Sequence, residues 1–202
     1  MKAICITTSP FEASFEGWGF RKSFIQLALD NYDVVYFVSM GRKKYEGFND
    51  RFFHILIKPT PISRFLDTPF YFVTAGLKIF KLGLHCDLIR ADGAAIELHA
   101  VIGSILSRKP LIISFRWDAA SNVKKFSGYK FRRIVGAIVH LIVKFSLRHA
   151  TKVIALTNTL KLKAIKMGVP SSRVIVIPTP VDTARFSPSV KGSDAKFRFG
   201  SR

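Results

Sequence analysis

One short stretch of the chain combines residues that could bind a charged sugar compound. Arg116, Trp117 and Asp118 close the apolar run Lys109–Asp118. An arginine can grip a phosphate group through its planar fork of donors, and a tryptophan ring can stack on a sugar face. The triplet therefore indicates a site for an anionic, ring-bearing ligand. The alternative is a surface Arg–Asp pair with Trp117 as a lid over the core.

A second pair of charged residues lies in the apolar run Cys86–Gly93, where Arg90 and Asp92 stand two positions apart. Alternate residues of an extended segment point to the same side, so these two side chains could form one polar pair. Whether such a pair would be structural or would bind substrate stays open from the sequence.

Two glycines precede a segment with helical spacing, and they could let backbone N–H groups approach a phosphate. They are Gly17 and Gly19, with Trp18 between them. The loop is longer than a GxGxxG motif and lacks its third glycine, so a simple turn is an equal alternative. Thr157 ends another apolar run and joins the candidate substrate-binding residues.

The residue types that bind metals do not occur at ligand spacing. The five histidines are scattered, the two cysteines are far apart, and no DxD pair is present. We therefore expect no metal site and no cofactor. The cysteines are expected to be small buried hydrophobes in a reducing compartment.

Short apolar runs alternate with segments of helical spacing, which predicts a parallel sheet covered on both faces, a doubly wound α/β domain of Rossmann-like type. In such folds ligands bind beyond the carboxyl ends of the strands, where the residues above would lie. Residues 1–178 are expected to form this domain, and residues 179–202 a linker. The predicted strands are 3–8, 33–40, 52–57, 86–93, 109–118 including a polar tip, 152–157 and 173–178. The predicted helices are 20–31, 64–84 with a break near Pro69, 94–108, 129–150 and 158–168.

The charge of the chain is strongly positive, with 32 Lys and Arg against 13 Asp and Glu and a net charge of +19. Between Ala119 and Val181 there are 12 basic residues and no acid. This balance favours anionic lipid, a phosphorylated substrate or nucleic acid as partner. No apolar run reaches the roughly 20 residues that span a bilayer.

The segment 129–150 is apolar apart from a basic edge. Its apolar flank could meet lipid while Arg132, Arg133, Lys144 and Arg148 meet headgroups. The alternative is a core helix with one solvated edge.

The stretch Lys152–Pro188 resembles the end of the N-terminal half of a GT-B fold glycosyltransferase of family 4, the glycosyl transferases group 1. It contains Gly168-Val169-Pro170, Ile177-Pro178, Val181-Asp182 and Phe186-Ser187-Pro188. More loosely, the loop with Gly17 and Gly19 matches the family's glycine loop, and the runs 86–93 and 109–118 match its two substrate-facing strands.

The resemblance implies a retaining, metal-independent transfer of a sugar from a nucleotide sugar to an acceptor. It implies that this chain is the acceptor-side half, and that a second domain, in cis or in trans, binds the donor nucleotide. We therefore expect residues 1–202 to be inactive alone, as a shortened form of a longer enzyme or one half of a split enzyme. With the positive charge, we expect a lipid-linked or saccharide acceptor, used in polysaccharide or glycolipid assembly at the inner face of the cell membrane.

The chain departs from the family pattern at three places. Arg116 occupies a position where the family often has histidine. Arg90 and Asp92 also occupy positions where the family often has histidine. Thr179-Pro180 occupies the position of the family's Asn-Gly pair. Arg116 cannot act as a neutral base, so no catalytic residue is assigned. The sequence leaves two rival functions: a basic nucleic-acid-binding α/β domain, and a dinucleotide-binding Rossmann domain, which would carry GxGxxG after the first strand.

Overall fold

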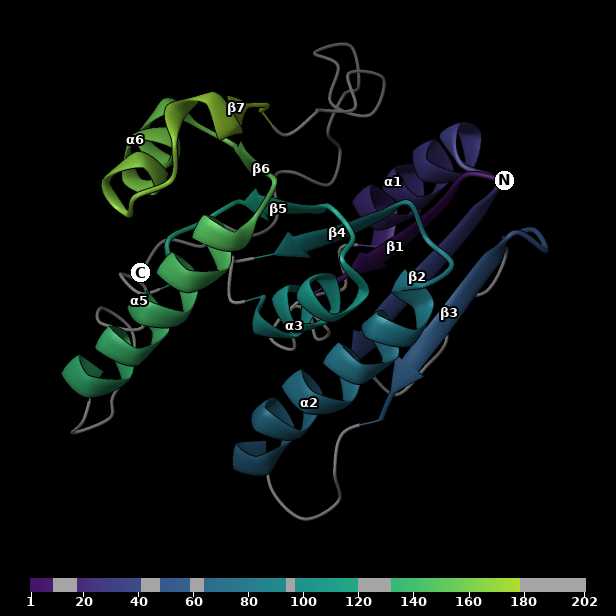
Figure 1. Ribbon diagram of the computed structural model, residues 1–202, viewed down its shortest axis with the longest axis horizontal. Helices are drawn as coiled ribbons and strands as arrows, with labels where there is room; N and C mark the ends of the chain where they lie inside the picture. Colours follow the sequence, from purple (N-terminus) through teal and green to yellow (C-terminus); the bar gives the residue numbers. More distant parts are fainter. Residues whose placement is uncertain (9–17, 41–47, 59–63, 94–96, 120–131, 179–202) are drawn as a thin grey trace, which may run out of the picture.

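The computed structural model describes residues 1–8, 18–40, 48–58, 64–93, 97–119 and 132–178, with backbone only at 18–23, 64–68 and 132. Strands and helices alternate along the described chain (Figure 1). In order they are β1 Ala3–Thr7, α1 Trp18–Asn31, β2 Val34–Met40, β3 Phe52–Ile57, α2 Arg64–Gly83, β4 Leu88–Gly93, α3 Leu98–Ser107, β5 Leu111–Phe115, α5 Arg132–His149, β6 Lys152–Ala155, α6 Asn158–Lys166, a 3-10 turn Ser171–Arg173, and β7 Val174–Val176.

The seven strands form one parallel sheet in the order β3-β2-β1-β4-β5-β6-β7. Every residue of β1 is buried, because this central strand pairs with β2 on one side and β4 on the other. The predicted doubly wound α/β fold is therefore confirmed, and most predicted strands lie within two residues of the observed ones.

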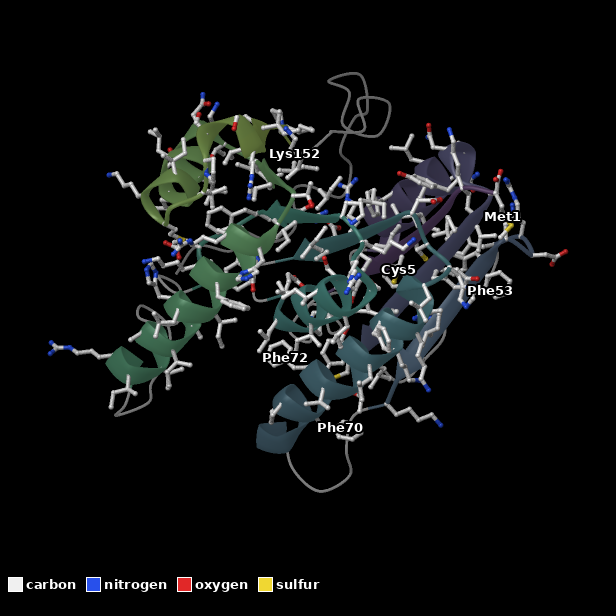
Figure 2. All side chains as sticks on the ribbon, viewed as in Figure 1. Met1, Cys5, Phe53, Phe70, Phe72 and Lys152 are labelled. Carbon is white, nitrogen blue, oxygen red and sulfur yellow. The ribbon has the colours of Figure 1, made fainter. Side chains whose placement is uncertain are left out.

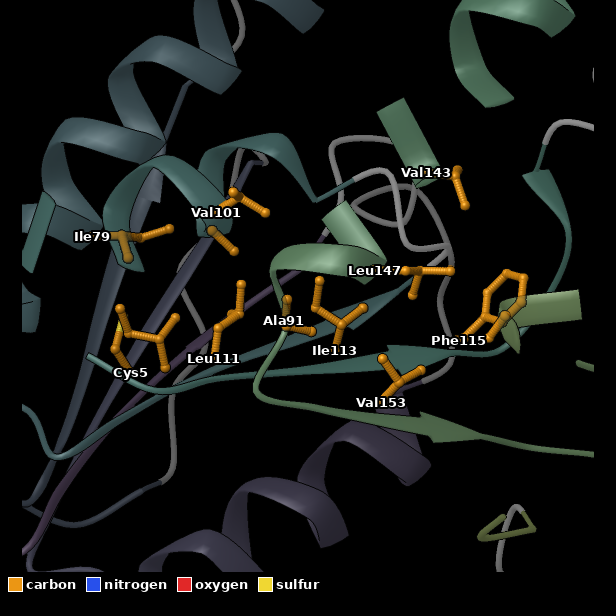
Figure 3. Packing of buried hydrophobic residues seen from close by; sticks show 14 of the residues in the cluster. Cys5, Ile79, Ala91, Val101, Leu111, Ile113, Phe115, Val143, Leu147 and Val153 are labelled. Atoms are coloured by element: carbon orange, nitrogen blue, oxygen red, sulfur yellow. The ribbon is translucent and has the colours of Figure 1, made fainter. Parts of the chain in front are cut away.

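The two faces of the sheet carry separate cores, and Figure 3 shows one of them. On one face, side chains such as Ala91 and Ile113 pack against Leu147 of α5 and against α2 and α3. On the other face, Ile6 packs with Ile25 of α1. Figure 3 shows α1 and the group of α3 and α5 on opposite sides of the strands. Side chains on alternate strand positions thus enter different cores.

The break expected near Pro69 is not observed, since α2 continues through this residue. Proline removes one helical hydrogen bond and crowds the preceding turn, at a cost of about 3 kcal/mol in a helix interior. Beyond it, Tyr71, Ala75 and Ile79 recur at four-residue spacing and are completely buried. Burial of that stripe outweighs the local penalty, an effect that propensity alone does not show.

A buried polar cluster joins β1 to α2 and α3. Thr7 Oγ1 lies 2.9 Å from Nε2 of His99, and the Tyr71 hydroxyl donates a hydrogen bond of 2.8 Å to the backbone oxygen of Thr8. The Tyr71 ring meets the His99 ring edge-on at 5.0 Å between centroids, and Nε2 of His99 is 3.4 Å from Oε2 of Glu97. Burial lowers the pKa of His99 to about 3. The cluster fixes the carboxyl end of β1 to the two helices above it.

Gly103 provides a test of the contact between α2 and α3. A Cβ atom there would lie 2.7 Å from Cβ of Ile79, which cannot swing away because it is attached to the α2 backbone. We expect Gly103→Ala to lower the free energy of unfolding by about 1–3 kcal/mol in urea denaturation, despite the better helix propensity of alanine. Gly76→Ala is the control, because its nearest neighbour at 3.2 Å is the terminal methyl group Cγ2 of Ile102. Equal stability of the two variants would contradict the tight contact at Gly103.

Because burial lowers the pKa of His99, we expect the free energy of unfolding to depend on pH. An unfolded chain takes up a proton at this imidazole near pH 6.5, whereas the folded chain does so only near pH 3. Protonation therefore favours the unfolded state, and stability is lost as the pH falls from about 6.5 towards 3, by up to about 1.4 kcal/mol per pH unit. We expect His99→Gln to flatten this part of the urea-denaturation profile and His85→Gln, at an exposed histidine, to leave it unchanged. A His99→Gln profile parallel to that of the wild type would show that folding does not change the pKa of His99.

Candidate functional site

The candidate site lies where the strand order reverses. The chain runs outward from β1 through β2 to β3 and then returns to the other side of β1 as β4. In an open parallel sheet this switch point leaves a crevice beyond the carboxyl ends of the two central strands. The residues at those ends are Thr7, the last residue of β1, with Thr8 after it, and Asp92 and Gly93 at the end of β4. Arg116 follows β5, the next strand along.

Asp92 and Arg116 form an ion pair at this edge. Nη2 of Arg116 donates to both carboxylate oxygens of Asp92, at 2.6 and 2.5 Å. The Asp92 side chain is 7% exposed and that of Arg116 is 24% exposed, so the pair is partly shielded from water but open on the arginine side. Charge-assisted hydrogen bonds of this length hold both groups in fixed positions.

Arg90 lies on the same side of β4 as Asp92, two residues earlier, but its guanidinium has a different neighbour. The guanidinium carbon is 4.4 Å from the ring centre of Phe24 of α1, a cation–π contact. Its Nε is buried and has no hydrogen-bond partner among the described residues. Burial lowers the pKa of Arg90, Asp92 opposes that effect, and the positive charge of Arg116 adds to it.

The sequence suggested that Arg90 and Asp92 could form one polar pair. In the structure the charge of Asp92 acts on Arg90, while the hydrogen bonds of Asp92 go to Arg116. Residue alternation correctly placed Arg90 and Asp92 on one face. The partner was decided by β5, which runs beside β4 and matches Asp92 with Ser114, two residues before Arg116. The structure therefore brings together three of the predicted site residues, namely Arg90, Asp92 and Arg116.

The other two residues of the triplet have different surroundings. Trp117 is partly buried and packs against the core on the α2, α3 and α5 face, as the alternative of a lid over the core suggested. Asp118 accepts a hydrogen bond of 2.9 Å from Nζ of Lys163 on α6. Stacking of Trp117 on a sugar stays a prediction.

Thr157 has a structural role at the start of α6. Its hydroxyl oxygen accepts a hydrogen bond of 3.2 Å from the backbone N–H of Leu160, which makes it the N-cap of that helix. Substrate binding by Thr157 stays a prediction. Trp18 and Gly19 are the first two residues of α1, and Gly17 lies outside the described residues.

Three residues near the site were not found from the sequence: Phe24, Ser114 and Lys163. Ser114 Oγ is buried beside Asp92 and has no partner among the described residues. Phe24 and Lys163 are separated from their charged neighbours by 66 and 45 positions, so no local pattern links them. In the described ranges, no group of three or more His, Cys, Asp or Glu residues could hold a metal ion.

A second candidate surface lies on α5, whose Val143 and Leu147 enter the core while other apolar residues are exposed. Figure 2 shows the side chains along this helix. Four apolar residues separated by four, three and four positions form an exposed stripe there: Ile134 at 58%, Ile138 at 52%, Leu141 at 63% and Phe145 at 43% exposure. Of the four predicted membrane-binding residues, Arg133 and Arg148 are exposed and Lys144 is partly buried; Arg132 is described by its backbone alone. Among the helices of the described part of the chain, none is long and apolar enough to cross a membrane.

Solved structures with the same fold include enzymes that act on nucleotide sugars. HepE from Anabaena, in complex with UDP and glucose, matches with a TM-score of 0.59 and 16% identity over 94% of this chain and 48% of its own. The lipopolysaccharide outer core galactosyltransferase WaaB matches at 0.57 and 11% over 89% and 46%. UDP-N-acetylglucosamine 2-epimerase from Rickettsia bellii matches at 0.55 and 13% over 96% and 50%.

At these identities the likeness shows the fold alone, and the epimerase shows that the fold is shared by more than one kind of enzyme. This chain spans about half the length of each of these structures. No curated protein sequence matches it significantly. The family model for Glycosyltransferase Family 4, however, matches residues 25–185, most of the chain. The resemblance inferred from the motifs is confirmed, and the chain belongs to Glycosyltransferase Family 4.

Proposed function

We propose that this chain is the acceptor-binding half of a retaining glycosyltransferase that moves a sugar from a nucleotide sugar to a lipid-linked or saccharide acceptor. The observation that carries the proposal is the family match over residues 25–185, combined with a charged site at the switch point of the matched fold. Residues 1–178 would form the acceptor-side domain, and residues 179–202 would lead to the domain that binds the donor.

The charged residues at this edge suit binding and charge stabilisation rather than proton transfer. The side chain of Arg116 has hydrogen-bond donors and no acceptor, so it is not suited to removing a proton from an acceptor hydroxyl. Asp92 already accepts two short hydrogen bonds from Arg116. In the proposed mechanism, positioned donors stabilise the negative charge that develops on the leaving diphosphate, and no metal ion is needed. The glycine loop at Gly17 and Gly19 would supply backbone N–H groups near that diphosphate.

Donor binding by this mechanism requires a second set of strand ends. A single doubly wound domain offers one crevice at its switch point, and here that crevice is lined by the residues proposed for the acceptor. The base and ribose of the nucleotide would then be bound by a domain of similar size, supplied in cis or in trans. This arrangement fits the finding that the chain spans about half of the structures it matches.

If this chain binds the acceptor and a second domain binds the donor, residues 1–202 on their own should bind donor weakly and transfer no sugar. We expect them to fold, to bind nucleotide sugars at best with a millimolar Kd, about −4 kcal/mol, and to transfer no sugar. Adding the donor-binding domain, covalently or in trans, should restore transfer. Calorimetry with nucleotide diphosphates and their sugars, together with a radiolabelled transfer assay, measures both quantities. Micromolar binding or measurable transfer by residues 1–202 alone would contradict the proposal.

The outer surface of α5 supports a membrane-bound setting. The exposed stripe Ile134, Ile138, Leu141 and Phe145 is flanked on the helix by Arg133, Lys144 and Arg148. A helix with this pattern can lie in the interface of a bilayer, its apolar residues among the acyl chains and its basic residues at anionic headgroups. We propose that this surface holds the protein at the inner, cytoplasmic face of the cell membrane, near lipid-linked acceptors used in polysaccharide or glycolipid assembly.

Vesicle binding tests the α5 surface. We expect the protein to co-sediment with vesicles that contain anionic lipid, and less so as salt rises, because headgroup attraction is screened. Ile138→Gln with Leu141→Gln should weaken co-sedimentation at least several-fold, since each buried apolar side chain contributes roughly 1.5–3 kcal/mol.

The matched control is Leu162→Gln, at a residue of α6 that is 59% exposed and lies outside the stripe. It should bind vesicles as the unmodified chain does. Equal binding of the α5 double variant, or equal partition to neutral vesicles, would refute the proposed surface. Tight binding to duplex DNA with a similar salt dependence would favour the nucleic-acid function.

A further inference from the structure

We propose that Arg90 and Arg116 form a binding site for an anionic group, a phosphate or a carboxylate, carried by the acceptor. Asp92 would be the internal counter-ion of that site. Identifying the ligand as the acceptor rests on the function proposed above, whereas binding of an anion depends only on the residues of this chain.

The first argument is the local charge. Two guanidinium groups and one carboxylate face the same side of the sheet at its carboxyl edge, so the cluster has an excess of one positive charge. The Nε atom of Arg90 is buried, so water solvates this charge poorly, and burial lowers the pKa of the group. A bound anion would restore the balance of charge in this partly shielded position.

The second argument is the unused donor of Arg90. Its guanidinium rests on the Phe24 ring, which fixes the plane of the group but accepts no hydrogen bond from its edge. The buried Nε has no partner among the described residues, and an unmade hydrogen bond of this kind costs about 1–3 kcal/mol. A phosphate or carboxylate oxygen at the edge of the guanidinium would satisfy it.

The third argument is access. The Arg116 side chain is 24% exposed and the Arg90 residue is partly buried, so a ligand can reach both side chains from solvent. The Nε atom of Arg90 is itself covered, so a hydrogen bond from it to the ligand requires the side chain to rotate. Both arginines lie near the switch point, and open parallel sheets bind their ligands at that point. Asp92, at 7% exposure, lies deeper and holds Arg116 in place by its two hydrogen bonds.

The test uses residues 1–202 and small anions, without any transfer assay. Methyl phosphate, acetate and UDP are titrated separately by NMR. The Nε–Hε signal of Arg90 is followed in the chains that keep this residue, and the backbone amide signals of Asp92 and Gly93 at the end of β4 are followed in every variant. We expect methyl phosphate or acetate to shift this signal with a millimolar Kd. Arg90→Met and Arg116→Met should each weaken binding about ten-fold or more, as expected for loss of a charge-assisted hydrogen bond. The control is Arg173→Met, at an exposed arginine of the 3-10 turn.

Asp92→Asn should change anion affinity in the opposite direction to the two arginine substitutions. Asparagine keeps an oxygen that can accept from Arg116 but removes a negative charge beside the bound anion, so methyl phosphate or acetate should bind more tightly, by about three- to ten-fold. If Arg90→Met does not fold, Arg90→Lys, which keeps the charge but loses the fork, should still show weaker binding.

Three results would overturn the inference. They are an Arg90 signal that no anion shifts, equal weakening by Arg173→Met, and weaker binding by Asp92→Asn. UDP binding that depends on Arg90 and is far tighter than that of methyl phosphate would assign the site to the donor instead. A failure of sugar transfer in the complete enzyme, with anion binding intact, would refute the proposed function but not this site.

Discussion

The central position of β1 is the constraint on which the rest of the structure depends. It pairs with β2 on one side and with β4 on the other, so the sheet grows in both directions from its first strand. The reversal of strand order places the carboxyl ends of β1 and β4 side by side without a helix between them. The buried cluster of Thr7, Tyr71 and His99 then ties that end of β1 to the helices of one face. The opposite face is left for Arg90 and Asp92.

The ion pair of Asp92 and Arg116 is better explained by function than by stability. Removing two charges from water costs free energy, and the attraction between the charges offsets only part of that cost. A partly buried ion pair is therefore weak evidence that the pair stabilises the fold. The same holds for Arg90, whose buried Nε has no partner among the described residues. A cluster that is poorly satisfied in the free protein is suited to gain hydrogen bonds when a ligand binds. Its position at the switch point supports that interpretation.

Arginine and aspartate at this edge of the sheet limit what it can do. A histidine can exchange a proton near pH 7, whereas the guanidinium of Arg116 can only donate hydrogen bonds. The one histidine in this region, His99, is completely buried on the other face and has its pKa lowered to about 3 by burial. It is therefore suited to a structural role, and the charged cluster is suited to recognition of an anion.

The sequence by itself determined the alternation of strands and helices, because continuous apolar runs and helical spacing are local patterns. It also placed Asp92 and Arg116 at strand ends, whereas Arg90 lies inside β4, and the motifs from Gly168 to Pro188 indicated the family. Only the tertiary structure decided the pairings. The register between β4 and β5 brings Arg116 within hydrogen-bonding distance of Asp92. The packing of α1 against the sheet places the Phe24 ring next to the Arg90 guanidinium. Burial of the apolar stripe of α2 stabilises that helix across Pro69. These contacts join segments far apart in the chain, and their energies come from burial and proximity, which no local sequence pattern records.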